Sequence, residues 1–196
     1  MSRDKILQNI SSNQPPAKPL PDLEFQHEES GIKEIYVEVL KKIGGKLFEV
    51  KSWDEIRSII TESFPAGARK ITTINELLDI ADTVQWKTQD PHALHDVEAA
   101  VIRAHFGVAE NGALWITDEL IFQQVVPFIT QHLLVVLPAS EIVPTMHQAY
   151  QRIGNVDYNF GVFIAGPSKT ADIEQSLVLG AHGPRTMTVF LLNEQP

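Results

Sequence analysis

The sequence contains no cysteine and no glycine-rich dinucleotide fingerprint of the form GxGxxG. The chain therefore has no thiolate nucleophile, forms no disulfide and does not ligate an iron–sulfur cluster through cysteine. Without the glycine fingerprint, the usual phosphate-binding turn of a dinucleotide site is also missing. Any redox centre that works with this chain is expected to belong to another protein.

Positive charge is scarce, because 16 Lys and Arg residues face 25 Asp and Glu residues and leave a formal net charge of −9. Such a surface opposes long-range attraction to nucleic acid and to anionic lipid. No apolar run approaches the roughly 20 residues that cross a bilayer, and the N-terminus lacks the long apolar stretch of a signal peptide. We therefore expect a cytoplasmic protein that binds no nucleic acid and does not insert into a membrane.

Length and proline distribution predict one globular domain preceded by an arm. The chain has 196 residues, of which 43% are hydrophobic, and this is enough for a single substantial core. A short helical pattern over Asp4–Ile10 is followed by four prolines that favour an extended chain: Pro15, Pro16, Pro19 and Pro21. We predict a flexible N-terminal arm over residues 1–30 and a domain over residues 31–196.

Within the domain, the apolar pattern predicts that strands alternate with helices. Helices are expected over Ile32–Ile43, Trp53–Glu62, Ala93–Arg103 and Val143–Ile153. Strands are expected over Leu47–Val50, Lys70–Thr73, His132–Leu137, Val162–Ala165 and Thr188–Leu192, with a hairpin around Asn111-Gly112. Ser52 is the expected N-cap of the second helix. This alternation predicts an α/β fold with a mostly parallel sheet flanked by helices.

Two glycine-anchored turns near the C-terminus are the most specific feature of the sequence. Gly166-Pro167-Ser168-Lys169-Thr170 follows an apolar strand, and Gly180-Ala181-His182-Gly183-Pro184-Arg185 precedes the last one. We expect the first turn to lead into a short helix with Thr170, Asp172 and Glu174 in its opening turn. Free amides at such a helix start can hold an anion.

The second turn offers side chains that suit a small carboxylate or phosphate. Arg185 can bind a carboxylate through two hydrogen bonds, and His182 can exchange a proton near neutral pH. In the structural alternative, Ser168 or Thr170 only caps the helix, while Arg185 pairs with an acid of this acidic chain. We expect the two turns to converge at one rim of the sheet as a site for negative charge, with these candidate ligand-binding residues: Gly166, Ser168, Lys169, Thr170, His182, Gly183 and Arg185.

Together the two segments resemble the LUD-domain family, in particular its lactate utilization protein C (LutC) members, which carry GPSxTxDIE followed by GxHGPR. The resemblance implies a fold similar to the NagB/RpiA/CoA-transferase type. It also implies a subunit or accessory protein of a system that oxidises L-lactate to pyruvate together with iron–sulfur partner proteins. No cofactor is expected on this chain itself, and a homo-oligomer is left open.

Glu110 supports an alternative function. Class I CoA-transferases share the implied fold type and use a glutamate in an ENG turn to attack an acyl-CoA thioester, and Glu110-Asn111-Gly112 is similar to that turn. Glu110 is therefore the candidate catalytic residue, although it could equally be a solvated hairpin residue or an acid that contacts the ligand. A non-catalytic ligand-binding or assembly module is the third hypothesis.

The remaining polar clusters predict no metal site. His92, His95, Asp96 and Glu98 fall in one short segment, but their spacing specifies no third ligand for a divalent metal. Other histidine and aromatic side chains are expected to fill core, edge or interface positions: His105, His132, Trp115, Phe122 and Phe128.

Overall fold

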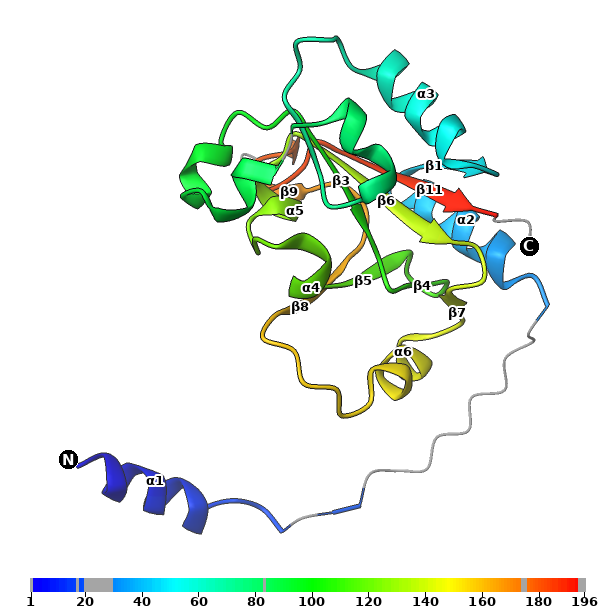
Figure 1. The fold of residues 1–196 in the computed structure, drawn as a ribbon. Helices are drawn as coiled ribbons and strands as arrows, with labels where there is room; N and C mark the ends of the chain where they lie inside the picture. Colours follow the sequence, from blue (N-terminus) through cyan, green and yellow to red (C-terminus); the bar gives the residue numbers. More distant parts are fainter. Residues whose placement is uncertain (1, 17, 20–29, 83, 174–175, 194–196) are drawn as a thin grey trace.

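The computed structural model describes residues 2–16, 18–19, 30–82, 84–173 and 176–193. Its centre is a five-stranded parallel sheet in the order β1-β11-β6-β3-β2 (Figure 1). The strands are β1 (Lys46–Val50), β11 (Thr186–Leu192), β6 (His132–Pro138), β3 (Ala99–Arg103) and β2 (Lys70–Thr72). This sheet confirms the predicted α/β fold.

Two helices cover opposite faces of the central sheet, α2 (Ile32–Lys42) and α3 (Trp53–Ser63) (Figure 1). Alternate residues of β6 explain the two layers: Leu133 packs in the same cluster as Leu40 of α2, whereas Leu134 packs with Ile56 of α3. Ser52 caps α3 as predicted, because its side chain accepts a hydrogen bond from the backbone N–H of Glu55.

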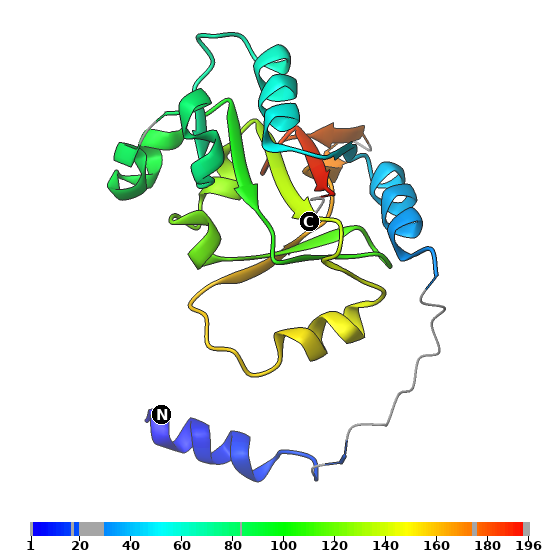
Figure 2. The same ribbon diagram turned by 45° about the vertical axis from the view of Figure 1, so that its right-hand side comes forward.

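A second sheet, with parallel and antiparallel pairs, was not expected from the sequence. It packs against the same hydrophobic cluster as β6 of the central sheet. Its order is β7-β4-β5-β8, with β7 (Ile142–Val143), β4 (Phe106–Val108), β5 (Ala113–Thr117) and β8 (Gly161–Ile164). Strands β4 and β5 form the predicted hairpin, and Gly112 in its turn has a φ of 71°. Helix α6 (Met146–Ile153) packs on the outer face of this sheet, away from the central sheet (Figure 2).

The predicted helix over Ala93–Arg103 is wrong. The start of this range belongs to a 3-10 turn, η3 (Pro91–Leu94). Its end, Ala99–Arg103, forms the strand β3 inside the parallel sheet. The run contains three alanines, Ala93, Ala99 and Ala100, and alanine has the strongest helix propensity. Neighbouring strands on both sides, β2 and β6, override that preference and bury the first four residues of β3.

The smaller elements refine the expected boundaries. The predicted helix from Val143 begins only at Met146, because the preceding residues form β7. The expected loop over residues 82–92 contains a 3-10 turn, η2 (Val84–Thr88), in addition to η3. Three further short elements complete this part of the chain: η1 (Asn75–Ile80), α4 (Asp118–Ile121) and α5 (Val126–Ile129).

Helix α1 (Arg3–Ser12) contributes no buried residue to any of these layers. Its three apolar side chains, Ile6, Leu7 and Ile10, are about half exposed. Across the part of the chain that the structure describes, no helix is both long enough and apolar enough to span a bilayer. The division into an arm of residues 1–30 and a following domain stays a prediction.

Candidate functional site

The two glycine turns lie side by side, as the sequence predicts. The backbone N–H of Ser168 donates to the carbonyl of Pro184 at 2.9 Å, and that of Gly180 donates to the carbonyl of Ser168 at 3.1 Å. Strands β9 (Lys169–Ile173) and β10 (Ser176–Leu179) continue this contact as an antiparallel pair. Backbone hydrogen bonds therefore join the two turns into one unit, whereas ligand binding by that unit stays a prediction.

The short helix expected after Gly166 does not form, and this prediction is wrong. Lys169 to Ile173 are the strand β9, whose Thr170 faces Val178 of β10. The cross-strand partner lies beyond the segment that suggested a helix, so the local pattern of acids at its start misled the prediction. Glu174 lies outside the described residues. Anion binding by free amides of a helix start is thus not available at this turn.

Glycine is required at Gly166 because of its close packing. Gly166 has a φ of 74°, and a Cβ atom there would lie 2.9 Å from the carbonyl oxygen of Ile43. The side chain of Ile43 would in turn lie 2.9 Å from a Cβ atom at Gly112. The hairpin turn and the first glycine turn therefore both pack against Ile43, the residue that follows α2.

The charged side chains of the two turns point to a surface with free positive charge. Lys169, His182 and Arg185 are all exposed, and Ser168 is partly buried between them. Among the described residues none of these three side chains forms an ion pair, whereas carboxylates bind four other arginines: Arg57, Arg69, Arg103 and Arg152. With no carboxylate partner among the described residues, Arg185 is a candidate for binding an external anion.

This unit lies at the amino ends of the parallel strands. Arg185 directly precedes β11, and the first residue of β11, Thr186, lies opposite His132, the first residue of β6. Ligands of open α/β sheets commonly bind at the other edge, outside the carboxyl ends of the strands.

Glu110 has a structural partner rather than the environment of a nucleophile. Its carboxylate accepts a hydrogen bond from the backbone N–H of Met146 at 2.8 Å, at the first residue of α6. Its own backbone N–H donates to the carbonyl of Pro144 at 3.0 Å. Negative charge at a helix start stabilises the helix. Covalent catalysis by Glu110 stays a prediction that this geometry does not favour.

We expect Glu110→Ala to lower the free energy of unfolding by about 0.5–2 kcal/mol, because the first N–H of α6 loses its side-chain acceptor. Glu110→Gln keeps an acceptor oxygen and is the matched control, with a loss of less than half that amount. Urea unfolding of the three proteins measures the difference. Equal losses in both variants would mean that the hydrogen bond to Met146 contributes nothing.

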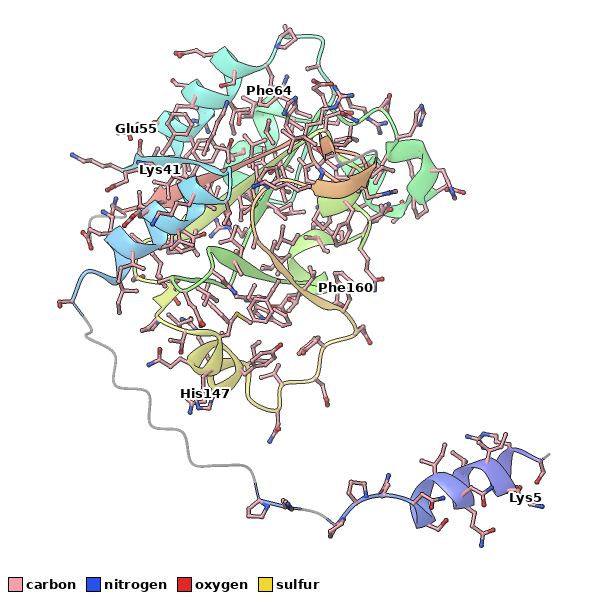
Figure 3. The ribbon with its side chains drawn as sticks, turned by 180° about the vertical axis from the view of Figure 1, so that it is seen from behind. Lys5, Lys41, Glu55, Phe64, His147 and Phe160 are labelled. Atoms are coloured by element: carbon pink, nitrogen blue, oxygen red, sulfur yellow. The ribbon has the colours of Figure 1, made fainter. Side chains whose placement is uncertain are left out.

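A concave site that the sequence did not reveal lies on the outer face of the second sheet. It has a volume of about 620 Å³, and β4 and β5 form its floor through Phe106 and Trp115. Helix α4, the end of α6 and the loop after α6 form its walls. Figure 3 shows how the chain runs from α6, marked by His147, through this loop to Phe160 before β8.

His105 is the central polar group of this cavity. Its Nε2 atom lies 2.7 Å from the hydroxyl oxygen of Thr117 and 3.3 Å from a carboxylate oxygen of Glu119. Burial lowers the pKa of His105 below its ordinary value; Glu119 opposes this effect and Arg152 adds to it. The neutral imidazole therefore predominates at pH 7.

Trp115 lies in a core cluster, as expected, and it also lines the cavity. His105 and the half-exposed Phe122 line the cavity too. No single segment signals this site, because its residues come from positions 105 to 159. The one local signal is the polar pair Asp118-Glu119 directly after the buried strand β5.

Across residues 2–16, 18–19, 30–82, 84–173 and 176–193, no group of three or more His, Cys, Asp or Glu side chains is arranged to hold a metal ion. In the segment with two histidines, Asp96 instead pairs with Arg69, and His92 pairs with Asp90.

Comparison with known proteins gives one family match: the family model described as LUD domain matches residues 33–192. Among curated proteins, Lactate utilization protein C from Exiguobacterium sp. is 30% identical over 122 residues, which cover 56% of this chain and 52% of that protein. The corresponding protein from Anoxybacillus flavithermus is 32% identical over 108 residues, covering 51% and 49%. These alignments span about half the length of the relatives.

A longer alignment exists with Lactate utilization protein C from Shouchella clausii, which is 28% identical over 182 residues and covers 88% of this chain and 74% of that protein. Among solved structures, the crystal structure of a DUF162 family protein from Deinococcus radiodurans superposes with a TM-score of 0.63 at 12% identity. It covers 85% of this chain and 99% of the other. At this identity the superposition supports the fold alone.

Proposed function

We propose, from the premise that this chain belongs to the LUD-domain family, that it is a LutC-like component of a system that oxidises L-lactate to pyruvate. Support comes from its similarity to several proteins named Lactate utilization protein C. In this proposal iron–sulfur proteins that act as its partners carry the electrons, and the lack of cysteine in this chain agrees with that division of labour. The chain itself binds no redox cofactor in this proposal.

The proposed role of this chain is to recognise a small carboxylate at the two glycine turns. The observation that carries the proposal is Arg185, which pairs with no carboxylate of the described residues and lies on a turn that backbone hydrogen bonds join to Ser168. A guanidinium binds a carboxylate through two parallel hydrogen bonds. Ser168, Lys169 and His182 lie on the same pair of turns and offer further donors for the carboxylate and the hydroxyl of lactate.

We expect L-lactate to bind the wild-type protein and Arg185→Gln to weaken that binding about tenfold or more, the loss of one charge-assisted contact. Lactamide has the same shape as lactate but no charge. We expect its affinity for the wild-type protein to be no higher than the affinity of lactate for Arg185→Gln. Arg3→Gln in α1 removes another exposed arginine, which has no ion-pair partner among the described residues, and leaves the affinity unchanged. Isothermal titration calorimetry or ligand-observed NMR measures all four.

Growth of the native organism on L-lactate tests the wider role with the same variants. Deletion of the gene abolishes growth, the wild-type gene and Arg3→Gln restore it, and Arg185→Gln does not. Equal affinities of the wild-type protein for lactate and lactamide would refute the proposed carboxylate site. Normal growth of the deletion strain would end the assignment to lactate oxidation while leaving the binding result intact.

A further inference from the structure

The cavity around His105 is separate from the glycine turns. His105 follows β3 at the carboxyl edge of the central sheet, whereas Arg185 precedes β11 at the amino edge. The carboxyl edge is the usual ligand position in open α/β sheets. With about 620 Å³, the cavity also falls within the range of small-molecule sites.

The contacts of His105 favour one of its two neutral tautomers. A carboxylate only accepts hydrogen bonds, so Glu119 favours the proton on Nε2, and the hydroxyl of Thr117 can accept from that nitrogen. In the neutral imidazole, Nδ1 then carries the lone pair. Among the described residues Nδ1 has no hydrogen-bond partner, although the side chain is only about 30% exposed. In this tautomer His105, which lines the cavity, keeps an acceptor nitrogen that no described residue uses.

The charges around the cavity disfavour an anion. Three carboxylates line it, those of Asp118, Glu119 and Asp157, against one guanidinium. That guanidinium, of Arg152, is already paired with Glu141 and lies 4.9 Å from the ring centre of Phe106. A free carboxylate such as lactate therefore meets net repulsion here, while a neutral or cationic molecule does not.

Aromatic side chains supply the apolar walls. The Tyr158 ring, nearly half exposed, stands edge-on to Trp115 with a centroid separation of 5.3 Å. Phe122, which is 51% exposed, also lines the cavity, and the ammonium of Lys87 lies 3.9 Å from its ring centre. Faces of such rings attract both other rings and cations.

Phe122 also holds a strained backbone at the cavity wall. Its φ of 57° is the only positive φ among the described residues that are not glycine. The next residue, Gln123, fixes this conformation, because its side-chain amide donates to the carbonyls of Trp86 at 2.5 Å and Gln89 at 3.1 Å. Strain of this kind persists where surrounding contacts enforce it, and it is frequent at ligand sites.

We propose that this cavity is a second ligand-binding site, which takes a neutral or cationic organic molecule with a ring and an N–H or O–H group that donates to His105 Nδ1. The ring lies between Tyr158 and Phe122, and Glu119 orients the imidazole and adds attraction for positive charge. The site is independent of the carboxylate site at the glycine turns, and its failure would leave that proposal untouched.

Three probes of the same shape test the charge preference: benzylammonium, benzyl alcohol and benzoate. We expect benzylammonium to bind most tightly, benzyl alcohol more weakly and benzoate least, in saturable titrations followed by Trp fluorescence and NMR. His105→Gln weakens benzylammonium and benzyl alcohol by about five- to tenfold, the loss of one hydrogen bond. Glu119→Gln weakens benzylammonium alone. His92→Gln, which breaks an exposed histidine–carboxylate pair elsewhere, changes nothing.

The tautomer of His105 gives a second readout that needs no variant. Nitrogen-15 NMR of the wild-type protein at pH 7.5 is expected to show a neutral ring with the proton on Nε2, and benzyl alcohol is expected to shift the Nδ1 resonance. A proton on Nδ1, tighter binding of benzoate than of benzylammonium, or the absence of saturable binding by any probe would each overturn the proposal.

Discussion

Replacing Gly166 with alanine is expected to lower the free energy of unfolding by about 2–4 kcal/mol, the sum of a left-handed backbone and an overpacked contact. Gly166 has a φ of 74°, and the new Cβ atom would lie 2.9 Å from the carbonyl oxygen of Ile43. Because that oxygen belongs to the backbone after α2, the clash cannot be relieved by a side-chain rotation. Chemical unfolding monitored by circular dichroism measures the loss.

Gly67→Ala is the matched control for this change. Gly67 has no atom within 4 Å of the position of an added Cβ and no positive φ, so alanine there leaves stability unchanged or raises it by up to about 1 kcal/mol. Similar losses at both glycines would show that the contact with Ile43 is not what requires glycine at position 166. Comparing the stability losses of the two variants therefore distinguishes the packed turn at Gly166 from the open one at Gly67.

The same contact links the stability of the domain to its candidate carboxylate site. Gly166 begins the turn whose Ser168 bonds to the second turn, and Pro167 and Lys169 pack over Gly44 at the end of α2. Three segments distant in sequence thus meet at the end of one helix. Recognition of a carboxylate by Arg185 would depend on this packing, because the second turn is held through the first.

Local patterns predicted the strands and turns whose signals lie within a few residues. The apolar run of β6 and the Asn111-Gly112 hairpin were both identified correctly, since burial on two faces and a turn with positive φ leave direct marks in the sequence. The nearness of the two glycine turns also followed, because each adjoins a strand end.

Elements whose structure depends on residues far away in the sequence were not predictable from local patterns. Ala99–Arg103 and Lys169–Ile173 are strands only because β6 and β10 pair with them, and both had been assigned to helices. The cavity depends on an even longer separation, since His105 meets Glu119 and Tyr158 only after two sheets and α6 have packed. The strained Phe122 has no sequence signature at all, because its φ is imposed by Gln123.

The second large expected effect is a gain in stability, and it comes from changing a buried tyrosine. Tyr36 of α2 is fully buried, and its hydroxyl oxygen has no hydrogen-bond partner among the described residues. Burial raises the pKa of Tyr36, so the hydroxyl is protonated at neutral pH. A buried polar group without a partner costs about 1–3 kcal/mol.

Tyr36→Phe removes that cost while keeping the ring, whose edge packs against Gly107. We expect the free energy of unfolding to rise by about 1–2 kcal/mol, because the variant loses an unsatisfied hydroxyl and only a small volume. Tyr150→Phe, at a residue that is 63% exposed, is the control and changes stability by less than about 0.5 kcal/mol. Urea unfolding distinguishes the two, and a loss of stability in Tyr36→Phe would establish that the hydroxyl is satisfied in solution.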